Sequence, residues 1–418
     1  MEVAVSSGTK TSRLPGEWEW RRIGEIGIPV RGGSPRPAGD PRYFDGSFIP
    51  WLTVAALTNI APSQLVVSET ATCLTEAGSA LSRILDPGTL IIANSGATLG
   101  IAKILGIKCC ANDGIAAVLG ISRKVSPRYL AHFINTKTQY LREVVATGNG
   151  QPNLNTALIR SFEIPLPPTR TEQEGIADAL SDADGLIESL ERLVTKKRQI
   201  KQGAMQELLT GKKRLAGFSE KVKAWSLGDL GRWTGGMTPS MRNPAYWHAG
   251  TIWWISSGDV KVPRLSATAF AITEAAATRG AATMVPANSI IVVTRSGILR
   301  KYLPVALNSV PMAINQDIKA LIPDGKVVPD FALQLLAYHG PEILASCLKS
   351  GTTVESIEFS WLKAFLVLVP KREEQTAIAT VLSDMDAEID ALETKLEKAH
   401  QIKQGMMQEL LTGRIRLI

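Results

Sequence analysis

The chain is poor in the residue types from which most catalytic and metal sites are built. Its 418 residues include only four histidines and four cysteines, and the cysteines form no CxxC pair. This pattern argues against a zinc site, and the scattered histidines offer no evident nucleophile–base pair. A GxxxxGK(S/T) phosphate loop is also missing. We therefore expect no catalytic residue, metal or cofactor in this chain, and a reducing cytoplasm as its setting.

Long apolar runs are missing as well. No apolar run approaches the roughly 18 residues that a membrane span needs. Residues 1–15 carry Ser and Thr but no apolar signal-peptide core, so we interpret them as a loose tail. At this length the chain exceeds one ordinary core, which predicts two or more domains. The net charge of +7 moderately favours a polyanionic partner.

An internal repeat organises the sequence. Residues 173–214 match residues 375–416 at a constant offset of 202, with 24 identities in 42 positions. A weaker repeat precedes each block, where Gly32-Gly-Ser-Pro35 matches Gly235-Gly-Met-Thr-Pro239 and Ile49-Pro-Trp51 matches Ile252-Trp-Trp254. The chain is therefore predicted to consist of two halves, each a divergent globular domain followed by a well-matched helix.

Apolar residues in both matched segments alternate at steps of four and three, which is the heptad pattern of a coiled coil. We expect a capping box at Thr171-x-x-Glu174 and left-handed helix ends at Gly211 and Gly413. The first helix, from about Thr171 to Leu209, would be on the order of 58 Å long. The predicted seam consists of Ile176, Leu180, Ile187, Leu190 and Val194 in the first helix and Ile378, Leu382, Ile389, Leu392 and Leu396 in the second.

Charge order predicts how the two helices run. From Glu172 to Glu191 every charged residue is acidic, and from Arg192 to Arg214 every one is basic except Glu207. The second helix has much the same order, so antiparallel packing sets each acidic half against a basic half. The alternative is two amphipathic helices docked separately on their own domains. The 3.5-residue period and the near-identical C-terminal blocks favour the coiled coil.

The excess positive charge lies on the globular parts. The segments 172–214 and 371–418 hold 15 basic and 17 acidic residues, so the rest of the chain carries a net charge of +9. Loops rich in Arg, Asn and Gln suit contacts with phosphates and base edges. Each such residue taken singly has the alternative role of satisfying turn geometry. In the first domain the candidates for DNA contact are Arg31, Ser34, Arg36, Arg42, Asn94, Ser95, Thr98, Asn112, Asn149, Gln151 and Asn153. In the second domain they are Thr238, Arg242, Arg295, Arg300, Lys301, Tyr302, Asn315, Gln316, Thr352 and Thr353.

Each half carries the same short motifs in the same order. A Trp is followed by a Gly-rich turn, as in Trp20-x-x-Ile-Gly24, and then by a Gly-Gly-x-(x)-Pro loop. Each globular domain ends in an apolar segment with Pro, Ile164-Pro-Leu-Pro-Pro168 or Leu368-Val-Pro370, and the helix that follows opens with Glu-Gln. In this duplicated order, which is more specific than any one motif, the chain resembles over nearly its whole length the specificity subunit of Type I restriction–modification systems. Lys371 replaces the second Pro that is usual in the family at the end of the domain.

The residues and the resemblance together predict an α+β protein with two pseudo-repeated mixed α/β target recognition domains. Two long helices that form an antiparallel coiled coil would join them. The expected boundaries are a tail at 1–15, domains at 16–168 and 215–370, and helices at 169–214 and 371–418. The resemblance implies that each domain reads one half of a split double-stranded DNA site, with the coiled coil as a ruler.

The resemblance also implies partners. Two modification subunits would dock on the helices and methylate adenine with S-adenosylmethionine, and restriction subunits would add ATP- and Mg-dependent translocation and cleavage. Three alternatives remain from the sequence. One is a protein-interaction scaffold that makes no DNA contact, and another is a specificity subunit of a modification-only system. A fused methyltransferase is the third, but Asn243-Pro-Ala-Tyr246 has Ala at its third position and lacks an accompanying cofactor loop.

Overall fold

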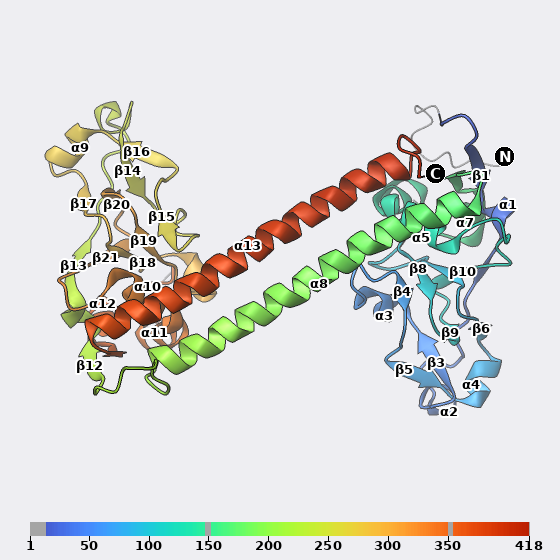
Figure 1. Ribbon diagram of the computed structural model, residues 1–418, viewed down its shortest axis with the longest axis horizontal. Coiled ribbons are helices and arrows are strands. Elements are labelled where there is room, and N and C mark those ends of the chain that lie inside the picture. Colours follow the sequence, from blue (N-terminus) through green and yellow to red (C-terminus); the bar gives the residue numbers. More distant parts are fainter. Residues whose placement is uncertain (1–13, 147–151, 350–353, 418) are drawn as a thin grey trace. The chain divides into compact units, whose positions relative to one another are not determined.

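The computed structural model describes residues 14–146, 152–349 and 354–417. The predicted tail at 1–15 therefore lies almost entirely outside the described residues. The chain divides into two compact units, residues 1–193 with 392–418 and residues 194–391. Both long helices contribute to both units (Figure 1). Among the described helices, none has the length and the apolar content that crossing a bilayer requires.

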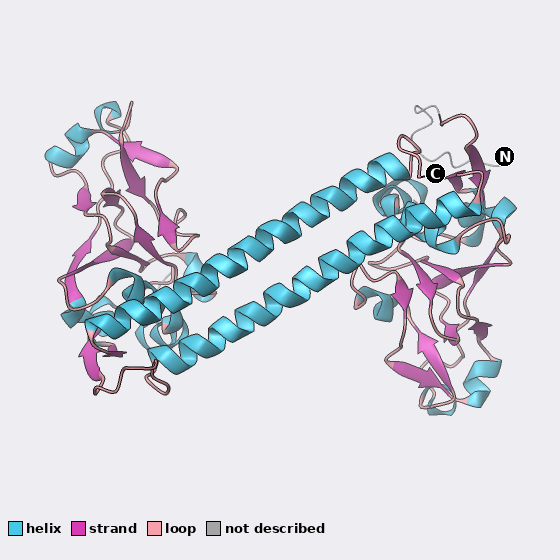
Figure 2. Cartoon of the chain, in the orientation of Figure 1, coloured by secondary structure: helices cyan, strands magenta, loops and turns pink. Residues whose placement is uncertain are grey.

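The strands of the first unit form three sheets (Figure 2). The smallest pairs β1 (Glu19–Arg22) with β11 (Glu163–Leu166). A five-stranded sheet has the order β2 (Ile28–Arg31), β10 (Ile115–Leu119), β7 (Leu90–Ala93), β8 (Ala102–Leu105), β4 (Val66–Val67). A four-stranded sheet has the order β5 (Thr72–Leu74), β3 (Ile49–Leu52), β9 (Cys109–Ala111), β6 (Arg83–Leu85). The β3–β9 and β4–β8 pairs are parallel and the others antiparallel.

Short helices connect these strands, and several begin at a side-chain cap. They are α1 (Ile23–Ile26), α2 (Pro41–Phe44), α3 (Val54–Thr58), α4 (Glu76–Ala80), α5 (Pro127–Thr136), α6 (Thr138–Tyr140), the π-helix η1 (Leu141–Val145) and α7 (Thr156–Ser161). Oxygen atoms of Asp40, Thr53, Thr75, Ser126 and Asn155 each accept a hydrogen bond from a backbone N–H in the first turn. These caps fix where the helices start because they satisfy N–H groups that have no partner within the helix.

The five-stranded sheet of this unit is buried on both faces. Along β7, Leu90 and Ile92 belong to the apolar cluster that contains α5, whereas Ile91 and Ala93 belong to the cluster beneath α3. Alternate residues of a strand point to opposite faces, so a continuous apolar run fits a strand covered on both sides. The α5 cluster also takes in Ile176 from the first long helix and Leu410 from the second.

The second unit repeats this topology strand for strand. Its two-stranded sheet pairs β12 (Lys223–Ser226) with β22 (Leu366–Val369). The five-stranded sheet has the order β13 (Gly231–Gly235), β21 (Ile318–Pro323), β18 (Ile290–Val293), β19 (Val305–Asn308), β15 (Arg264–Leu265). The four-stranded sheet has the order β16 (Phe270–Ile272), β14 (Ile252–Ile255), β20 (Met312–Ile314), β17 (Thr283–Val285). The β14–β20 and β15–β19 pairs are again the parallel ones.

The helices of the second unit fill corresponding positions. They are η2 (Leu227–Leu230), η3 (Pro244–Tyr246), α9 (Glu274–Thr278), η4 (Gly297–Arg300), α10 (Pro329–Tyr338), α11 (Gly340–Cys347) and α12 (Phe359–Ala364). Phe331 and Leu335 of α10 are fully buried against the five-stranded sheet. Met205, Leu208 and Leu209 from the end of the first long helix join the same core. The expectation of two pseudo-repeated mixed α/β domains is confirmed.

The long helices α8 (Arg170–Leu209) and α13 (Arg372–Leu410) pack together in antiparallel directions. In the first unit Lys403 Nζ donates to Asp184 Oδ1 at 2.5 Å, and Arg416 Nη2 donates to Glu172 Oε2 at 2.9 Å. As the residue number rises along α8, the residue number of the basic ion-pair partner falls, so the two segments run in opposite directions. In the second unit the equivalent pairs are Lys201–Asp386 and Arg214–Glu374, and each residue lies 202 positions from its counterpart in the first unit. The prediction from charge order is confirmed.

The ends of the long helices differ from expectation at one point. Thr169, rather than Thr171, caps α8, because its Oγ1 accepts from the Glu172 N–H at 3.2 Å. The helix begins directly after Pro167 and Pro168, which places Thr171 inside the first turn, so the predicted capping box is wrong. Gly211 and Gly413 have φ of +67° and +72°, the left-handed conformation expected at both C-terminal ends.

The predicted seam residues have two kinds of surroundings. Ile176, Leu180, Ile378 and Leu382 are buried in the globular cores of their own units. This part of each helix fits the docked-helix alternative. Further along, Ile187, Val194 and Ile389 are buried outside these cores, whereas Leu190, Leu392 and Leu396 are half-buried. The coiled-coil seam as a continuous set of these residues stays a prediction.

Candidate nucleic-acid interface

Three loops of the first unit meet at Asp113. This residue lies in the turn between β9 and β10. Ser34 Oγ, from the loop after β2, donates to Asp113 Oδ1 at 2.8 Å. Asn94 Nδ2, directly after β7, donates to the Asp113 carbonyl oxygen at 3.2 Å. Arg31 Nε donates to the same carbonyl at 2.5 Å, and Arg36 Nη2 lies 3.5 Å from the Asp113 carboxylate. The structure thus brings four predicted DNA-contact residues to one acidic residue that the prediction missed.

A glycine makes this convergence possible. Gly32 donates its N–H to the Ile115 carbonyl at 2.8 Å, which carries the loop against the β9–β10 turn. A Cβ at Gly32 would lie 2.1 Å from the Asn112 carbonyl oxygen, far inside contact distance. In the second unit a Cβ at Gly236 would lie 2.0 Å from the Asn315 carbonyl oxygen. The repeated Gly-Gly motif therefore serves close backbone approach, in the same place in both units.

The second unit gathers a corresponding set of loops. Thr238 Oγ1 donates to Gln316 Oε1, across from the loop after β13 to the β20–β21 turn. Asn315 is 5% exposed, and its Oδ1 accepts from the Asp317 N–H at 3.1 Å. The Arg295 N–H, directly after β18, donates to the Asp317 carbonyl at 3.1 Å. The Arg295 side chain is exposed, and none of the described residues forms a hydrogen bond or ion pair with it.

The other predicted contact residues have different partners or surroundings. Arg42 pairs with Asp40, the N-cap residue of α2, at 2.6 Å, and this pairing lowers the pKa of Asp40. Arg300 forms an ion pair with Glu355, which lowers the pKa of that carboxyl. Lys301 and Tyr302 line a separate cavity of about 400 Å³ beside Pro304. Arg242 and Asn153 are exposed in loops. Asn149, Gln151, Thr352 and Thr353 lie outside the described residues.

Several buried side-chain oxygens of the first unit have unused hydrogen-bonding capacity. Within the described part of the chain, Asn94 Oδ1, Asn112 Oδ1 and Thr98 Oγ1 are buried and have no partner. Asn94 and Thr98 are 2% and 4% exposed, and Ser95 between them is half-buried. An unpaired buried oxygen costs free energy, so we expect water or a bound group to supply a hydrogen-bond donor to each of these atoms.

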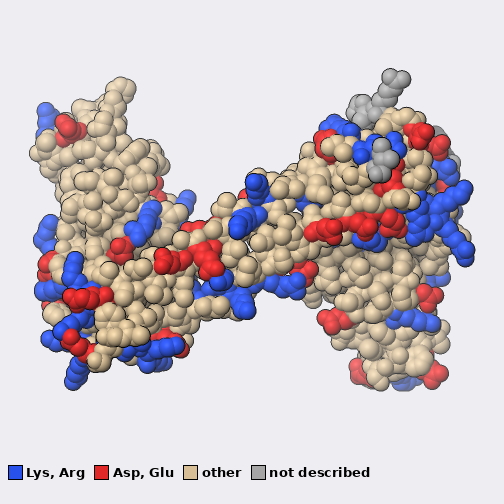
Figure 3. All heavy atoms as spheres, viewed as in Figure 1, with Lys and Arg blue, Asp and Glu red and all other residues tan. Residues whose placement is uncertain are grey.

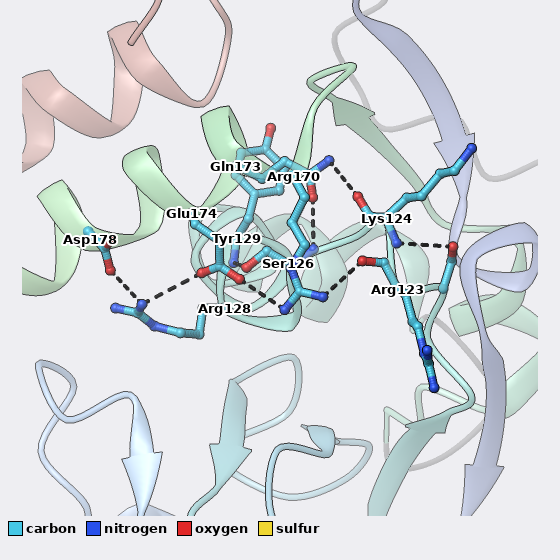
Figure 4. A network of polar contacts seen from close by, with 10 residues as sticks. Arg123, Lys124, Ser126, Arg128, Tyr129, Arg170, Gln173, Glu174 and Asp178 are labelled. Atoms are coloured by element: carbon cyan, nitrogen blue, oxygen red, sulfur yellow. Dashed lines mark hydrogen bonds and ion pairs between the residues drawn. The ribbon is translucent and has the colours of Figure 1, made fainter. Parts of the chain in front are cut away.

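A second polar network fixes the start of each long helix to its globular domain, and Figure 4 shows it for α8. Gln173 Oε1 accepts from the Ser126 N–H at 2.8 Å, and its Nε2 donates to the carbonyls of Pro167 at 3.0 Å and Lys124 at 3.3 Å. Gln375 makes the same three contacts with Val328, Pro370 and Lys326. The repeated Glu-Gln motif, noted in the sequence only as a helix opening, thus supplies a buried junction in both units.

Charged side chains of one sign gather in separate groups along the long helices (Figure 3). Where groups of opposite sign meet, they form ion pairs, as between Lys197 and Glu388 at 2.6 Å in the second unit. Over the described ranges no group of three or more His, Cys, Asp or Glu is placed to hold a metal ion. Burial raises the pKa of Cys109 to about 12, so its thiol stays protonated at neutral pH.

The fold and the paired loop clusters define a protein with two related recognition-type domains on two antiparallel helices. The family described as the Type I restriction modification DNA specificity domain matches residues 15–202 and 219–402. Because the two matches together cover well over half of the sequence, the chain belongs to this family and carries two copies of its domain.

Individual relatives agree with this membership. The specificity subunit of the Type I restriction enzyme EcoR124I/EcoR124II from Escherichia coli is 35% identical over 191 residues, 46% of this chain and 47% of that protein. The MjaIX specificity subunit from Methanocaldococcus jannaschii is 31% identical over 185 residues, 44% of this chain and 41% of that protein. The chain spans less than half the length of these relatives in each match.

A solved structure shares the fold over the whole chain. The S subunit of a Type I restriction–modification system from M. genitalium superposes with a TM-score of 0.59 and 13% identity. The superposition covers 96% of this chain and 97% of that one.

Proposed function

We propose that this chain is the DNA-recognition subunit of a Type I restriction–modification complex. The domains at 16–168 and 215–370 would each read one half of a split double-stranded target. The observation that carries the proposal is the repeated loop cluster in a chain of this family. Each unit directs the loops after two strands and one β-turn to the same place, and the polar side chains differ between the units. Different side chains on one scaffold are what reading two different half-sites requires.

The segments 169–214 and 371–418 would dock two modification subunits. These helices have nearly identical C-terminal blocks, whereas the globular domains diverge. Ile200 and Ile402, at equivalent positions, are 46% and 53% exposed. Exposed apolar residues repeated at the same positions of two helices support two copies of one protein partner. The modification subunits would bind S-adenosylmethionine and methylate adenine in each half-site.

Catalysis would belong to the partners of this chain. Restriction subunits would bring ATP and Mg for translocation and cleavage, and the complex would work in the cytoplasm. The 40-residue helix α8 is about 60 Å long at 1.5 Å per residue, which suits a ruler between half-sites. A protein-interaction scaffold without DNA contact and a modification-only system are the competing functions. The net charge of +9 outside the helices favours DNA over the scaffold.

Co-expression of the chain with the modification subunit from the same source, followed by mapping of methyladenine across the host genome, tests the proposal. The expected result is methylation confined to one split motif, in which exchange of one globular domain changes one half. Stable binding of an active modification subunit without sequence-confined methylation would refute DNA recognition and support the scaffold. Adding the restriction subunit then distinguishes a nuclease complex from a modification-only system.

A further inference from the structure

One cross-loop hydrogen bond occurs at the same place in both units. In the first unit it joins Ser34 of the Gly-Gly loop to Asp113 of the β9–β10 turn at 2.8 Å. In the second it joins Thr238 of the Gly-Gly loop to Gln316 of the β20–β21 turn. The loop residue is a hydroxyl in both cases. The turn residue is a carboxylate in the first unit and a carboxamide in the second. The hydroxyl group that bonds to the turn residue is therefore the part of the pair that both units share.

The Asp113 side chain is held firmly but keeps free acceptor capacity. Its backbone carbonyl accepts from Arg31 and Asn94, and its N–H donates to Ser34 Oγ at 3.3 Å. Among the described residues, the carboxylate itself forms polar contacts only with Ser34 and Arg36, and its side chain remains 41% exposed. A carboxylate has about four acceptor positions, so roughly half of them are unused.

A carboxylate at this place is unfavourable for phosphate contact and favourable for base reading. Its negative charge repels DNA phosphates, although arginines and buried amides surround it. In the major groove a carboxylate accepts a hydrogen bond from an exocyclic amino group and is rejected by the carbonyl of guanine or thymine. Gln316 has both a donor and an acceptor, which is the combination that pairs with adenine.

Resting on the proposed DNA recognition, we propose that Asp113 is a specificity-determining residue of the first domain. It would accept a hydrogen bond from the exocyclic amino group of cytosine in the first half-site. Ser34 would be the positioning residue that orients its carboxylate. The corresponding pair in the second domain, Thr238 with Gln316, would present a neutral amide to the second half-site, so the two domains would read different base edges from one geometry.

The test uses the full chain in complex with its modification subunit. Selectivity at each position of the wild-type motif is measured by competition between DNA duplexes that differ by one base pair. D113N keeps the size of the side chain but adds a donor, so we expect selectivity at one position of the first half-site to fall about tenfold or more. The second half-site should remain unchanged, which also shows that the variant complex is folded.

Three further variants complete the test: one at the positioning residue, one control and one in the second domain. S34A leaves the Asp113 carboxylate in place but removes the hydrogen bond that orients it, so we expect selectivity at the same position to weaken less than in D113N. D86N removes an exposed carboxylate that precedes β7, at the opposite end of that strand from Asn94, and should leave every position unchanged. Q316E should alter selectivity in the second half-site alone.

The outcomes distinguish this inference from the proposed function. If the wild-type complex shows no sequence preference, the proposed DNA recognition itself fails. If the wild type reads a split motif and D113N reads it with the same selectivity at every position, Asp113 is not a base-reading residue. Equal weakening of D113N on all duplexes would also overturn the inference, because it would reduce Asp113 to structural support. Loss of selectivity at one position of the first half-site would establish it.

Discussion

Replacing Gln173 with Leu should destabilise the first unit selectively. Gln173 is 1% exposed, and its amide satisfies one backbone N–H and two carbonyls at the junction of α8 with the globular domain. Leu has a similar volume but no polar atom, so the cavity cost is small and the loss of hydrogen bonds dominates. The fully buried Ser126 N–H would be left without an acceptor.

The magnitude follows from these three contacts. A buried donor left unpaired costs about 1–3 kcal/mol, and carbonyls that lose a donor add a smaller amount. We expect the free energy of unfolding of the first unit to fall by about 3 kcal/mol, a large share of the roughly 5–15 kcal/mol typical of a domain. Urea denaturation followed by tryptophan fluorescence and circular dichroism measures this change.

Matched variants make the test specific. Q375L removes the same three contacts from the second unit and should lower its stability by a similar amount. The double variant should show additive losses, because the two sites lie in separate units. Q401L, at an exposed position of α13, is the control and should change stability by no more than about 0.5 kcal/mol. A Q173L loss as small as that of the control would refute the reasoning.

Three other predictions concern a buried lysine, an exposed arginine and a glycine. Lys103 is 2% exposed, and burial lowers its pKa from 10.5 to about 8. Between pH 8 and pH 10.5 the folded chain has therefore released a proton that the unfolded chain keeps. The stability of the wild type relative to K103M should therefore rise with pH across that window, by up to about 3 kcal/mol, in urea titrations at several pH values. R295A should relax selectivity in the second half-site alone, as measured by methyladenine mapping. G32A should displace the first Gly-Gly loop and weaken duplex binding through the first half-site. G39A is the control for added bulk, because a Cβ at Gly39 meets no atom within 4 Å. The φ of +75° at Gly39 also strains an Ala there.

Each of these predictions has a contradicting result. A constant stability difference between the wild type and K103M from pH 7 to pH 10.5 would mean that Lys103 is not desolvated. Equal loss of binding to all duplexes by R295A would make Arg295 a phosphate contact. Wild-type selectivity at every position in G32A would show that the loop tolerates a Cβ beside the Asn112 carbonyl.

The sequence by itself determined the architecture of this protein. The offset of 202 fixed the two halves, the apolar period fixed the helices, and the order of acidic and basic residues fixed their antiparallel direction. These features are periodic or local, and the same periodicity that positions side chains on a helix is visible in the sequence. Gly211 and Gly413 were predictable for the same reason, because a left-handed helix end is a local requirement.

Only the tertiary structure decided which polar residues meet. Ser34 and Asp113 are separated by 79 positions, and no local pattern indicates that a hydroxyl and a carboxylate so far apart share a hydrogen bond. Arg42 and Arg300 looked equivalent to Arg31 in the sequence, but each is paired with a carboxylate of its own. Asp113 was overlooked because an acidic residue argues against DNA contact until its neighbours are known. The one available signal was its alignment with Gln316, directly after the Asn shared by both turns. Long-range pairing depends on how sheets and turns close in three dimensions, and that closure set the candidate site.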